Sequence, residues 1–293
     1  MVKATRIVLA AVAAALVCGC GIALSASGEP GSGPPAIGAV RPVGSGADIV
    51  LPFDAYRHTA TEINVIERAT ALLARDCLGR FGHDWTPPTA DAVDTSRPAA
   101  GGRYGIVDAA EVARLGYHAP VRPDRPAQPQ PPLDVLMVYT GKGASTVGGR
   151  PVPEGGCVGE ARRRLEEGVP TAMPGAAFAE LDRELYLTAQ ADERVQRLMA
   201  GWRGCMAESG RQYADVWAAN DDVRWSSPEP TPEEIASAKA DLACRTRTGL
   251  AGTWLAVETA YQQRAIKERS PEFDALAKAM QVRLANARRV TDR

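Results

Sequence analysis

Apolar side chains recur at three- and four-residue spacing along most of the chain after residue 59, which is typical of helices with one buried face. The first such segment begins at a capping box formed by Thr59 and Glu62. Its apolar face carries Ile66, Ala69, Leu73, Cys77 and Phe81. The same periodicity and similar start signals predict further helices over 108–115, 158–167, 176–187, 190–209, 232–267 and 271–289.

One short run breaks this pattern. Residues 133–139 (LDVLMVY) are apolar, partly β-branched and followed by Gly141, which predicts a strand, with a small hairpin as its context. Residues 86–103 and 119–132 are rich in Pro, Asp and Ala and are expected to be loops.

The N-terminus has the pattern of an export signal. Lys3 and Arg6 precede an apolar stretch over 7–17. Residues 17–20 (VCGC) resemble a bacterial lipobox, in which the final Cys receives a diacylglycerol and becomes the mature N-terminus. We therefore expect a signal peptide over 1–19 and an acylated Cys20, with chains such as palmitate.

Two other interpretations of this segment remain open. Apolar or small residues continue to Leu24, so an uncleaved anchor would also fit, although the segment is short for a span. Ordinary cleavage near residues 23–25 would instead release a secreted protein. All three interpretations place the rest of the chain outside the cytoplasm, and the lipobox favours the outer face of the cytoplasmic membrane.

The segment after the signal has no apolar periodicity. Residues 28–46 read GEPGSGPPAIGAVRPVGSG, a composition that keeps a chain extended. We expect a flexible tether over 20–49 and a single, mostly helical extracytoplasmic domain over 50–293.

Four cysteines lie in that domain: Cys77, Cys157, Cys205 and Cys244. An even number in an exported chain predicts two disulfides, and the absence of a C-x-x-C pair disfavours zinc. Sequence alone allows three pairings. The sequence predicts a mostly α fold, a disulfide-stapled helical bundle with a small β element near 133–139.

A weak internal repeat favours one pairing. The runs 77–82 (CLGRFG) and 205–210 (CMAESG) each end a predicted helix, and an aromatic residue follows each Cys at the same offset. If the two runs are related, each Cys pairs with the next one, which gives Cys77–Cys157 and Cys205–Cys244; if the similarity is chance, all three pairings stay open. The second bond would hold the helices over 190–209 and 232–267 side by side.

That arrangement makes a specific packing prediction. Residues 210–231 would return the chain as a loop, and Trp254 would be buried against Val195 and Leu198 on the partner helix.

Several short runs together support a resemblance. They are Cys77-Leu78-x-Arg80-Phe81-Gly82, Arg103-Tyr104-Gly105, Leu115-Gly116-Tyr117-His118, Gly155-Gly156-Cys157, Trp202-x-x-Cys205-Met206 and Ala240-Asp241-Leu242-Ala243-Cys244. Together they resemble uncharacterised envelope lipoproteins of high-GC Gram-positive bacteria over roughly residues 50–265. The resemblance implies an exported, lipid-anchored protein and brings no catalytic residue with it.

Composition narrows the possible functions. The chain has 34 basic and 35 acidic side chains and a formal net charge of −1, which excludes the basic surplus of a general nucleic-acid binder. Only three histidines are present, and they lie far apart: His58, His83 and His118. Each could act as a general base, but a partly buried, hydrogen-bonded histidine is the simpler interpretation.

The other candidate motifs for catalysis or ligand binding are weak. Residues 140–146 (TGKGAST) do not fit a phosphate loop, because Gly follows the Lys. Asp76, Asp84, Asp108 and Glu111 could supply paired carboxylates, yet the last two are better explained as helix capping. The run 162–167 (RRRLEE) is expected to form Arg–Glu pairs four residues apart on a solvated face, and the basic end of the chain, 283–293, is explained by the helix dipole.

The sequence thus predicts no catalytic residue, cofactor or metal site. It favours a non-enzymatic lipoprotein, anchored to the membrane through Cys20, that binds an envelope protein or a cell-wall polymer. The alternative is an extracytoplasmic hydrolase acting on an envelope substrate, which would need a pocket where histidine and carboxylate groups converge.

Overall fold

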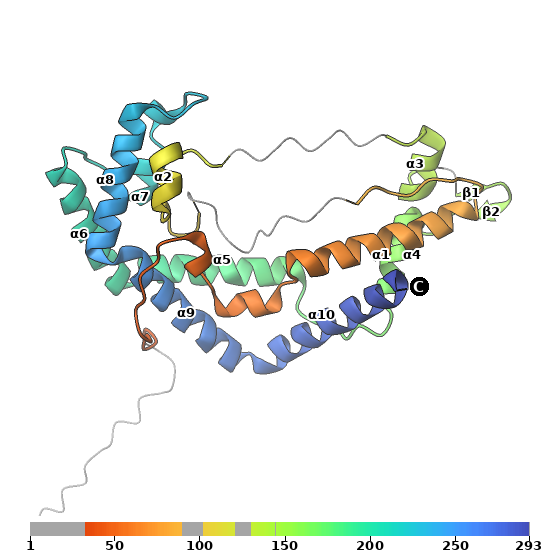
Figure 1. The fold of residues 1–293 in the computed structure, drawn as a ribbon. Coiled ribbons are helices and arrows are strands. Elements are labelled where there is room, and N and C mark those ends of the chain that lie inside the picture. The colour runs from red at the N-terminus through yellow and green to blue at the C-terminus, as the bar shows by residue number, and fades with distance from the viewer. Residues whose placement is uncertain (1–32, 90–101, 121–129, 144, 293) are drawn as a thin grey trace, which may run out of the picture. The chain divides into compact units, whose positions relative to one another are not determined.

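Helices make up most of the chain that the computed structural model describes, which is residues 33–89, 102–120, 130–143 and 145–292 (Figure 1). The α-helices are α1 Ala60–Gly79, α2 Ala109–Leu115, α3 Leu133–Thr140, α4 Gly156–Leu165, α5 Gly175–Ala191, α6 Glu193–Glu208, α7 Val216–Asn220, α8 Pro232–Thr248, α9 Leu250–Glu268 and α10 Ser270–Thr291. Short 3-10 helices cover Gly46–Asp48, Pro52–Tyr56 and Val223–Trp225. The mostly α prediction is confirmed.

The prediction of a β element near 133–139 is wrong in its position. Residues 133–140 form α3, in which Val135 and Val138 are buried at helical spacing and Gly141, at φ +70°, ends the helix. A short apolar run does not distinguish strand from helix by periodicity, and packing on α4 decided it here. The hairpin lies further on, where β1 (Thr146–Val147) pairs antiparallel with β2 (Arg150–Pro151).

The long helix predicted over 232–267 is two helices. Gly249 adopts a left-handed conformation, φ +68°, and ends α8, so α9 starts in a new direction at Leu250 (Figure 1). The start of α8 is as expected, since the Thr231 hydroxyl accepts from the Glu234 backbone N–H. The expected loop over 210–231 contains α7 and one 3-10 helix.

The helices pack in two groups joined by α5 and α9. At one end α1 packs on α4 and α10, and α3 packs on α4; at the other end α8 packs on α2, α6 and α7. Between them α5 packs on α9 and α6, and α9 packs on α6, α8 and α10. We call the first group the Cys77 region and the second the Cys205 region, after the disulfide that each contains.

Both predicted disulfides are present. Cys77 and Cys157 join α1 to α4 with Cα atoms 5.5 Å apart, and Cys205 and Cys244 join α6 to α8 with Cα atoms 5.6 Å apart. The repeat in the sequence has a structural counterpart at the helix ends. Gly82 and Gly210 adopt positive φ, and the N–H groups of His83 and Arg211 each donate to the carbonyl oxygen five residues back. Both ends are therefore the same Schellman motif.

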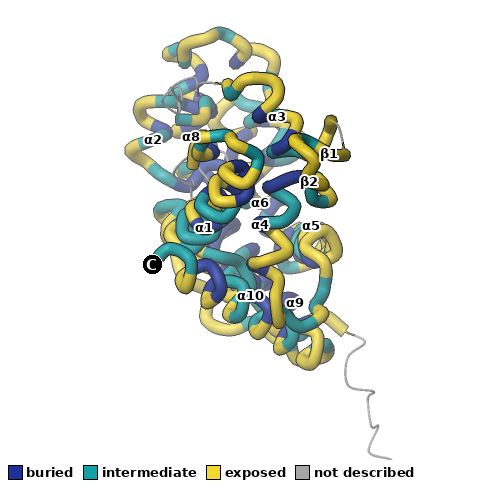
Figure 2. The backbone as a smooth tube through the Cα atoms, turned by 90° about the vertical axis from the view of Figure 1, so that its right-hand side faces the viewer, coloured by how far each residue is buried: buried dark blue, intermediate teal, exposed yellow. Residues whose placement is uncertain are grey.

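The largest core lies in the Cys205 region. Trp202 of α6 and Trp254 of the adjoining α9 are fully buried in this core, and the burial of Trp254 was predicted; Val195 and Leu198 belong to the same cluster. The rings closest to Trp254 were not foreseen: they belong to Tyr104, Tyr186 and Trp217. Figure 2 shows the contrast between these buried inner faces and exposed elements such as the β hairpin.

The packed body begins earlier than the sequence suggested. Residues 34–45, which we call the strap, run extended across α9, so the predicted tether over 20–49 overlaps the body from Pro34 onward. Ile37 and Val43 pack on the large core, and Arg194 donates to the Pro35 carbonyl at 2.8 Å. The remainder of the predicted tether, residues 20–32, and the signal peptide over 1–19 lie outside the described residues.

Among the described residues, no helix combines the length and the apolar character that crossing a membrane requires.

Candidate functional site

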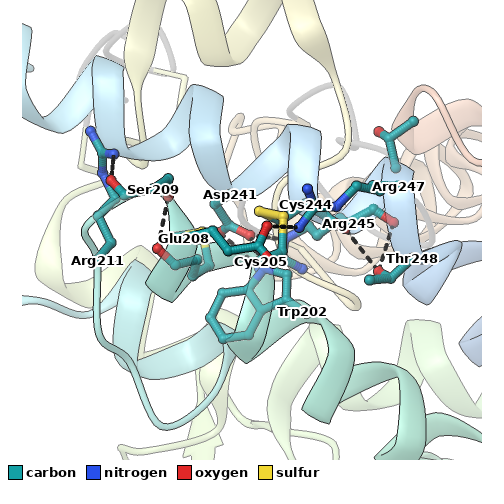
Figure 3. Close-up of a disulfide and its surroundings, with 12 residues drawn as sticks. Trp202, Cys205, Glu208, Ser209, Arg211, Asp241, Cys244, Arg245, Arg247 and Thr248 are labelled. Atoms are coloured by element: carbon teal, nitrogen blue, oxygen red, sulfur yellow. Dashed lines mark hydrogen bonds and ion pairs between the residues drawn. A yellow bond between two sulfur atoms is a disulfide. The ribbon is translucent and has the colours of Figure 1, made fainter.

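The Cys205–Cys244 disulfide lies beside a buried ion pair (Figure 3). Arg245 donates to both carboxylate oxygens of Asp241, at 2.6 and 3.1 Å, and the Trp202 indole donates to Asp241 at 2.6 Å. Helix α8 aligns Asp241 and Arg245 because they are one turn apart.

The same cluster ties in a distant segment. The Tyr117 hydroxyl donates to Asp241 at 3.2 Å, and Arg245 also donates to the backbone carbonyl of Tyr104. Burial is the main cause that raises the pKa of the Tyr117 hydroxyl, and the Asp241 carboxylate adds to it. Every acceptor in this cluster is satisfied by a donor of the body itself, so the cluster holds α8 to the 102–118 segment.

A second ionic cluster lies between α5 and α9. Arg103 donates to Asp182 at 2.8 Å and to Glu258 at 2.8 Å, and the Tyr104 hydroxyl donates to Glu258 at 2.7 Å. Gln262 donates to Asp182 and Glu258 and accepts from the Phe53 backbone N–H. Burial raises the pKa of the Glu258 carboxyl, while its bonds to Arg103 and Tyr104 oppose that shift.

His118 occupies a structural position. Its Nδ1 lies 2.7 Å from Glu234 and its Nε2 lies 2.8 Å from the Ser227 carbonyl. Both neighbours are acceptors, so the ring donates twice only when it is protonated, and the bond to Glu234 raises the pKa of His118. Gly116, at φ +60°, makes room for this pair, because a Cβ there would lie 2.7 Å from a Glu234 oxygen.

The other two histidines are placed differently. His83 lies 3.9 Å from Asp134, and its buried Nε2 makes no hydrogen bond, so it departs from the expectation of a hydrogen-bonded histidine. His58 lies 3.7 Å from Glu62, but neither of its buried ring nitrogens makes a hydrogen bond, which also departs from that expectation. Burial lowers the pKa of His58.

The remaining sequence candidates are structural. The Asp108 carboxylate caps α2 by accepting from the N–H groups of Ala110 and Glu111, as predicted. Asp76 pairs with its neighbour Arg75. Asp76 lies on α1 in the Cys77 region, whereas Asp108 and Glu111 lie at the start of α2 in the Cys205 region, so Asp76 does not form a carboxylate pair with either of them.

The charged run over 162–167 pairs in an unexpected way. The predicted i, i+4 pairs do not form; instead Glu166 accepts from Arg283 of α10, at 2.5 and 2.9 Å, and Arg163 donates to the Glu154 carbonyl. Packing of α4 on α10 made the long-range partner available, and sequence spacing carries no sign of it.

A hollow with a largely apolar wall lies under the strap. It has a volume of about 250 Å³, and we call it the strap pocket. Its lining joins three segments of the chain: the strap, residues 106–107 and the corner between α8 and α9. Its apolar lining residues are Val40, Pro42, Val43, Ile106, Val107, Leu242 and Ala251.

Two glycines shape this pocket. Gly249 turns the chain between α8 and α9, and Gly252 lets the strap lie directly on α9, because a Cβ there would meet the Arg41 carbonyl oxygen at 2.2 Å. A second hollow, of about 480 Å³, lies on the other side of the strap and shares Arg41, Pro42 and Gly252 with the first.

Two arginines line the strap pocket, and no acidic residue does. Arg245 is held by Asp241, whereas the Arg41 side chain is exposed and forms no ion pair with any described residue. The charge at this pocket is therefore positive and comes from Arg41.

Sequence reasoning missed the strap pocket. In the sequence the strap resembles a flexible linker, because it is rich in Gly and Pro. That composition does not distinguish a free segment from a packed one. A signal was present in α9, where Gly252, Ala256 and Ala260 recur every four residues and leave a flat face on which a backbone can lie.

The remaining predicted site residues are the cysteines. Cys20 lies outside the described residues, and the four other cysteines are paired as expected. Among the residues that the structure describes, no three His, Cys, Asp or Glu side chains are grouped so that they could hold a metal ion.

Comparison with known proteins adds no relative: no protein-family model matches the chain, and neither a curated protein nor a solved structure matches it.

Proposed function

We propose that this chain is an exported, lipid-anchored protein of a bacterial envelope that binds another envelope component and is not an enzyme. The single observation that carries the proposal is the pairing of Cys77 with Cys157 and of Cys205 with Cys244. Stable disulfides form in oxidising compartments, so these bonds agree with the export signal over residues 1–19.

The anchor would be Cys20, in the lipobox-like run over 17–20, and the body would face away from the cytoplasm. Two acyl chains on one residue hold a protein to a membrane stably, whereas a single chain does not. The 14 residues from Cys20 to Gly33 could span at most about 50 Å, so the start of the strap at Pro34 would stay within about that distance of the bilayer.

Binding without catalysis is supported by how the body uses its titratable groups. Asp241, Glu258 and His118 are each engaged in bonds that join separate segments of the fold. The strap pocket, by contrast, offers an apolar wall and an available cation, which suits binding.

One observation favours the hydrolase alternative. His58 lines two adjoining hollows beside α10, has no hydrogen-bond partner among the described residues and lies near the Glu62 carboxylate. If the protein is a hydrolase that uses this histidine, His58→Gln should abolish turnover of an envelope-derived substrate while leaving the fold intact. Unchanged turnover would remove His58 as its base.

The anchor is tested by labelling cells with radioactive palmitate and separating membranes from the medium. We expect the wild-type chain to carry label in the membrane and Cys20→Ser to lose both label and membrane association. Cys18→Ser is the matched control, because it changes the neighbouring cysteine and should behave as wild type. Membrane retention of unlabelled Cys20→Ser with an intact N-terminus would contradict the proposal in favour of a spanning anchor.

A further inference from the structure

We propose that the strap pocket binds the chain of an anionic amphiphile, such as a medium-chain fatty acid, with its acid group at Arg41. This deepens the proposed function by naming a class of ligand, and it rests on the proposal that the chain is a binding protein. Three properties of the pocket carry it: the wall, the volume and the charge.

The wall selects an apolar ligand. The branched side chains of Val40 and Val43 come from the strap, Ile106 and Val107 lie opposite, and Leu242 is contributed by α8. Ile106 and Val107 are almost completely buried, so this wall is fixed by the core. The Thr246 hydroxyl is the one side-chain hydroxyl among the lining residues, and it already donates to the Leu242 carbonyl at 2.9 Å.

The volume sets the length of the ligand. At about 30 Å³ for a group the size of a water molecule or a methylene, a pocket of about 250 Å³ takes about eight such groups. A chain of about eight to ten carbons would therefore be covered, and its head would reach the rim. Burial of each methylene contributes about 0.8 kcal/mol at most, which makes a chain the main source of affinity.

The charge selects an anion. Arg41 lines both the strap pocket and the second hollow, and its side chain is exposed and forms no ion pair with a described residue, so its charge is available to a ligand head at the rim of the pocket. Asp48 is the acidic residue that lines the second hollow; its carboxylate accepts from the backbone N–H groups of Gly44 and Ser45, at 2.9 and 2.8 Å, and forms no ion pair with Arg41. A carboxylate or phosphate head therefore meets an unpaired cation, whereas a cationic head would be repelled.

The experiment uses the full chain in its own membranes, so that no fragment has to fold alone. Membranes are irradiated with a decanoic acid that carries a diazirine, and the labelled peptides are mapped. We expect label in the strap and in residues 242–252, displaced by unlabelled decanoate and not by decyltrimethylammonium. Label spread evenly over exposed surfaces, or equal displacement by both compounds, would overturn the proposal.

Variants locate the site. Thr246→Trp places an indole in the pocket from an exposed position of α8 and should abolish site-specific labelling. Ala243→Trp is the matched control, since Ala243 is exposed on the same helix and lines no part of the strap pocket. Equal labelling of both variants would contradict the assignment.

The role of the cation is tested with Arg41→Gln, which should raise the half-displacing decanoate concentration about tenfold, as expected for loss of one charge-assisted bond. An unchanged concentration would refute the anionic part of the proposal. Labelling that appears only in Cys20→Ser would show that the protein's own acyl chain fills the pocket, which also overturns it. These outcomes are independent of palmitate incorporation at Cys20, so failure here leaves the proposed function standing.

Discussion

The two disulfides of this protein stabilise regions of very different character. The Cys205 region contains the aromatic core, with Trp202 and Trp254 fully buried, and the Asp241–Arg245 ion pair. In the Cys77 region the disulfide lies among small and aliphatic side chains, Ala74, Leu78, Val135, Val138 and Ala161, and no aromatic ring is fully buried in that cluster.

This difference indicates that the two disulfides contribute differently to the stability of their regions. A region with little apolar area to bury depends more on covalent constraint of the unfolded chain. In the Cys205 region the bond adds to a core that already holds α6 against α8 and α9. We therefore expect the Cys77–Cys157 bond to be indispensable for its region, and the Cys205–Cys244 bond to be supplementary.

Removal of each disulfide in turn tests this expectation and should change the free energy of unfolding the most. In the chain-entropy account, losing the Cys77–Cys157 bond, which joins residues 80 apart, costs about 4.5 kcal/mol, and losing the Cys205–Cys244 bond, with a separation of 39, costs about 4 kcal/mol. Urea unfolding of the two double Ser variants measures both. We further expect α1 and α4 to lose amide-exchange protection in the first variant, whereas α6 and α8 keep most of theirs in the second. If α1 and α4 kept their protection in the first variant while α6 and α8 lost theirs in the second, this expectation would be contradicted.

Replacing one tryptophan by alanine in each core compares the two cores directly. Trp254→Ala empties a fully buried site between three aromatic rings and should lower the free energy of unfolding by about 3–5 kcal/mol. Trp85→Ala removes a half-buried ring that packs edge-on against Tyr139 and should cost about 1–2 kcal/mol. Denaturant titration with both disulfides intact provides the measurement, and equal costs would show that the two cores are equivalent.

Two histidines should give opposite pH effects. His118, at the Cys205 region, has a raised pKa because it donates to Glu234, so between its unfolded value near 6.5 and its folded value the native state holds more protons than the unfolded state. Its contribution to stability is therefore full below about pH 6.5 and is lost as the pH rises through the folded pKa. His58, beside α10, has a pKa lowered by burial, so the unfolded state binds the extra proton and stability rises with pH up to about 6.5.

Unfolding free energies of the wild type, His118→Gln and His58→Gln between pH 5 and 8 separate these two effects. The difference between wild type and His118→Gln should shrink with rising pH, and the difference for His58→Gln should change in the opposite direction. Parallel curves for the two variants would contradict the assignment of opposite shifts.

The smallest effect concerns the ion pair between α4 and α10. Glu166 and Arg283 are partly exposed, so Glu166→Gln should lower stability by only about 0–1 kcal/mol, and less at high salt. Thermal unfolding at low and high salt measures it, with Glu167→Gln as the control on the neighbouring, more exposed carboxylate. A loss above about 2 kcal/mol would mean that the α4–α10 contact depends on charge rather than on packing.

Features that depend only on neighbouring residues could be predicted from the sequence. The capping box at Thr59, the cap at Asp108 and the helix ends at Gly82 and Gly210 are local hydrogen-bond patterns, and each formed where the residues predicted it. The similarity of two such helix ends favoured the disulfide pairing that the structure shows, although the four cysteines alone left three pairings open.

The partners of distant segments, in contrast, became apparent only from the packed structure. Residues 133–140 became a helix because their buried side chains pack on α4, and Glu166 paired with Arg283 rather than with its own helix. The strap looked like a linker until Gly252 allowed its backbone to lie on α9. Contacts of this kind depend on surfaces that exist only after the helices have packed, and the local pattern of residues does not encode which surfaces will meet.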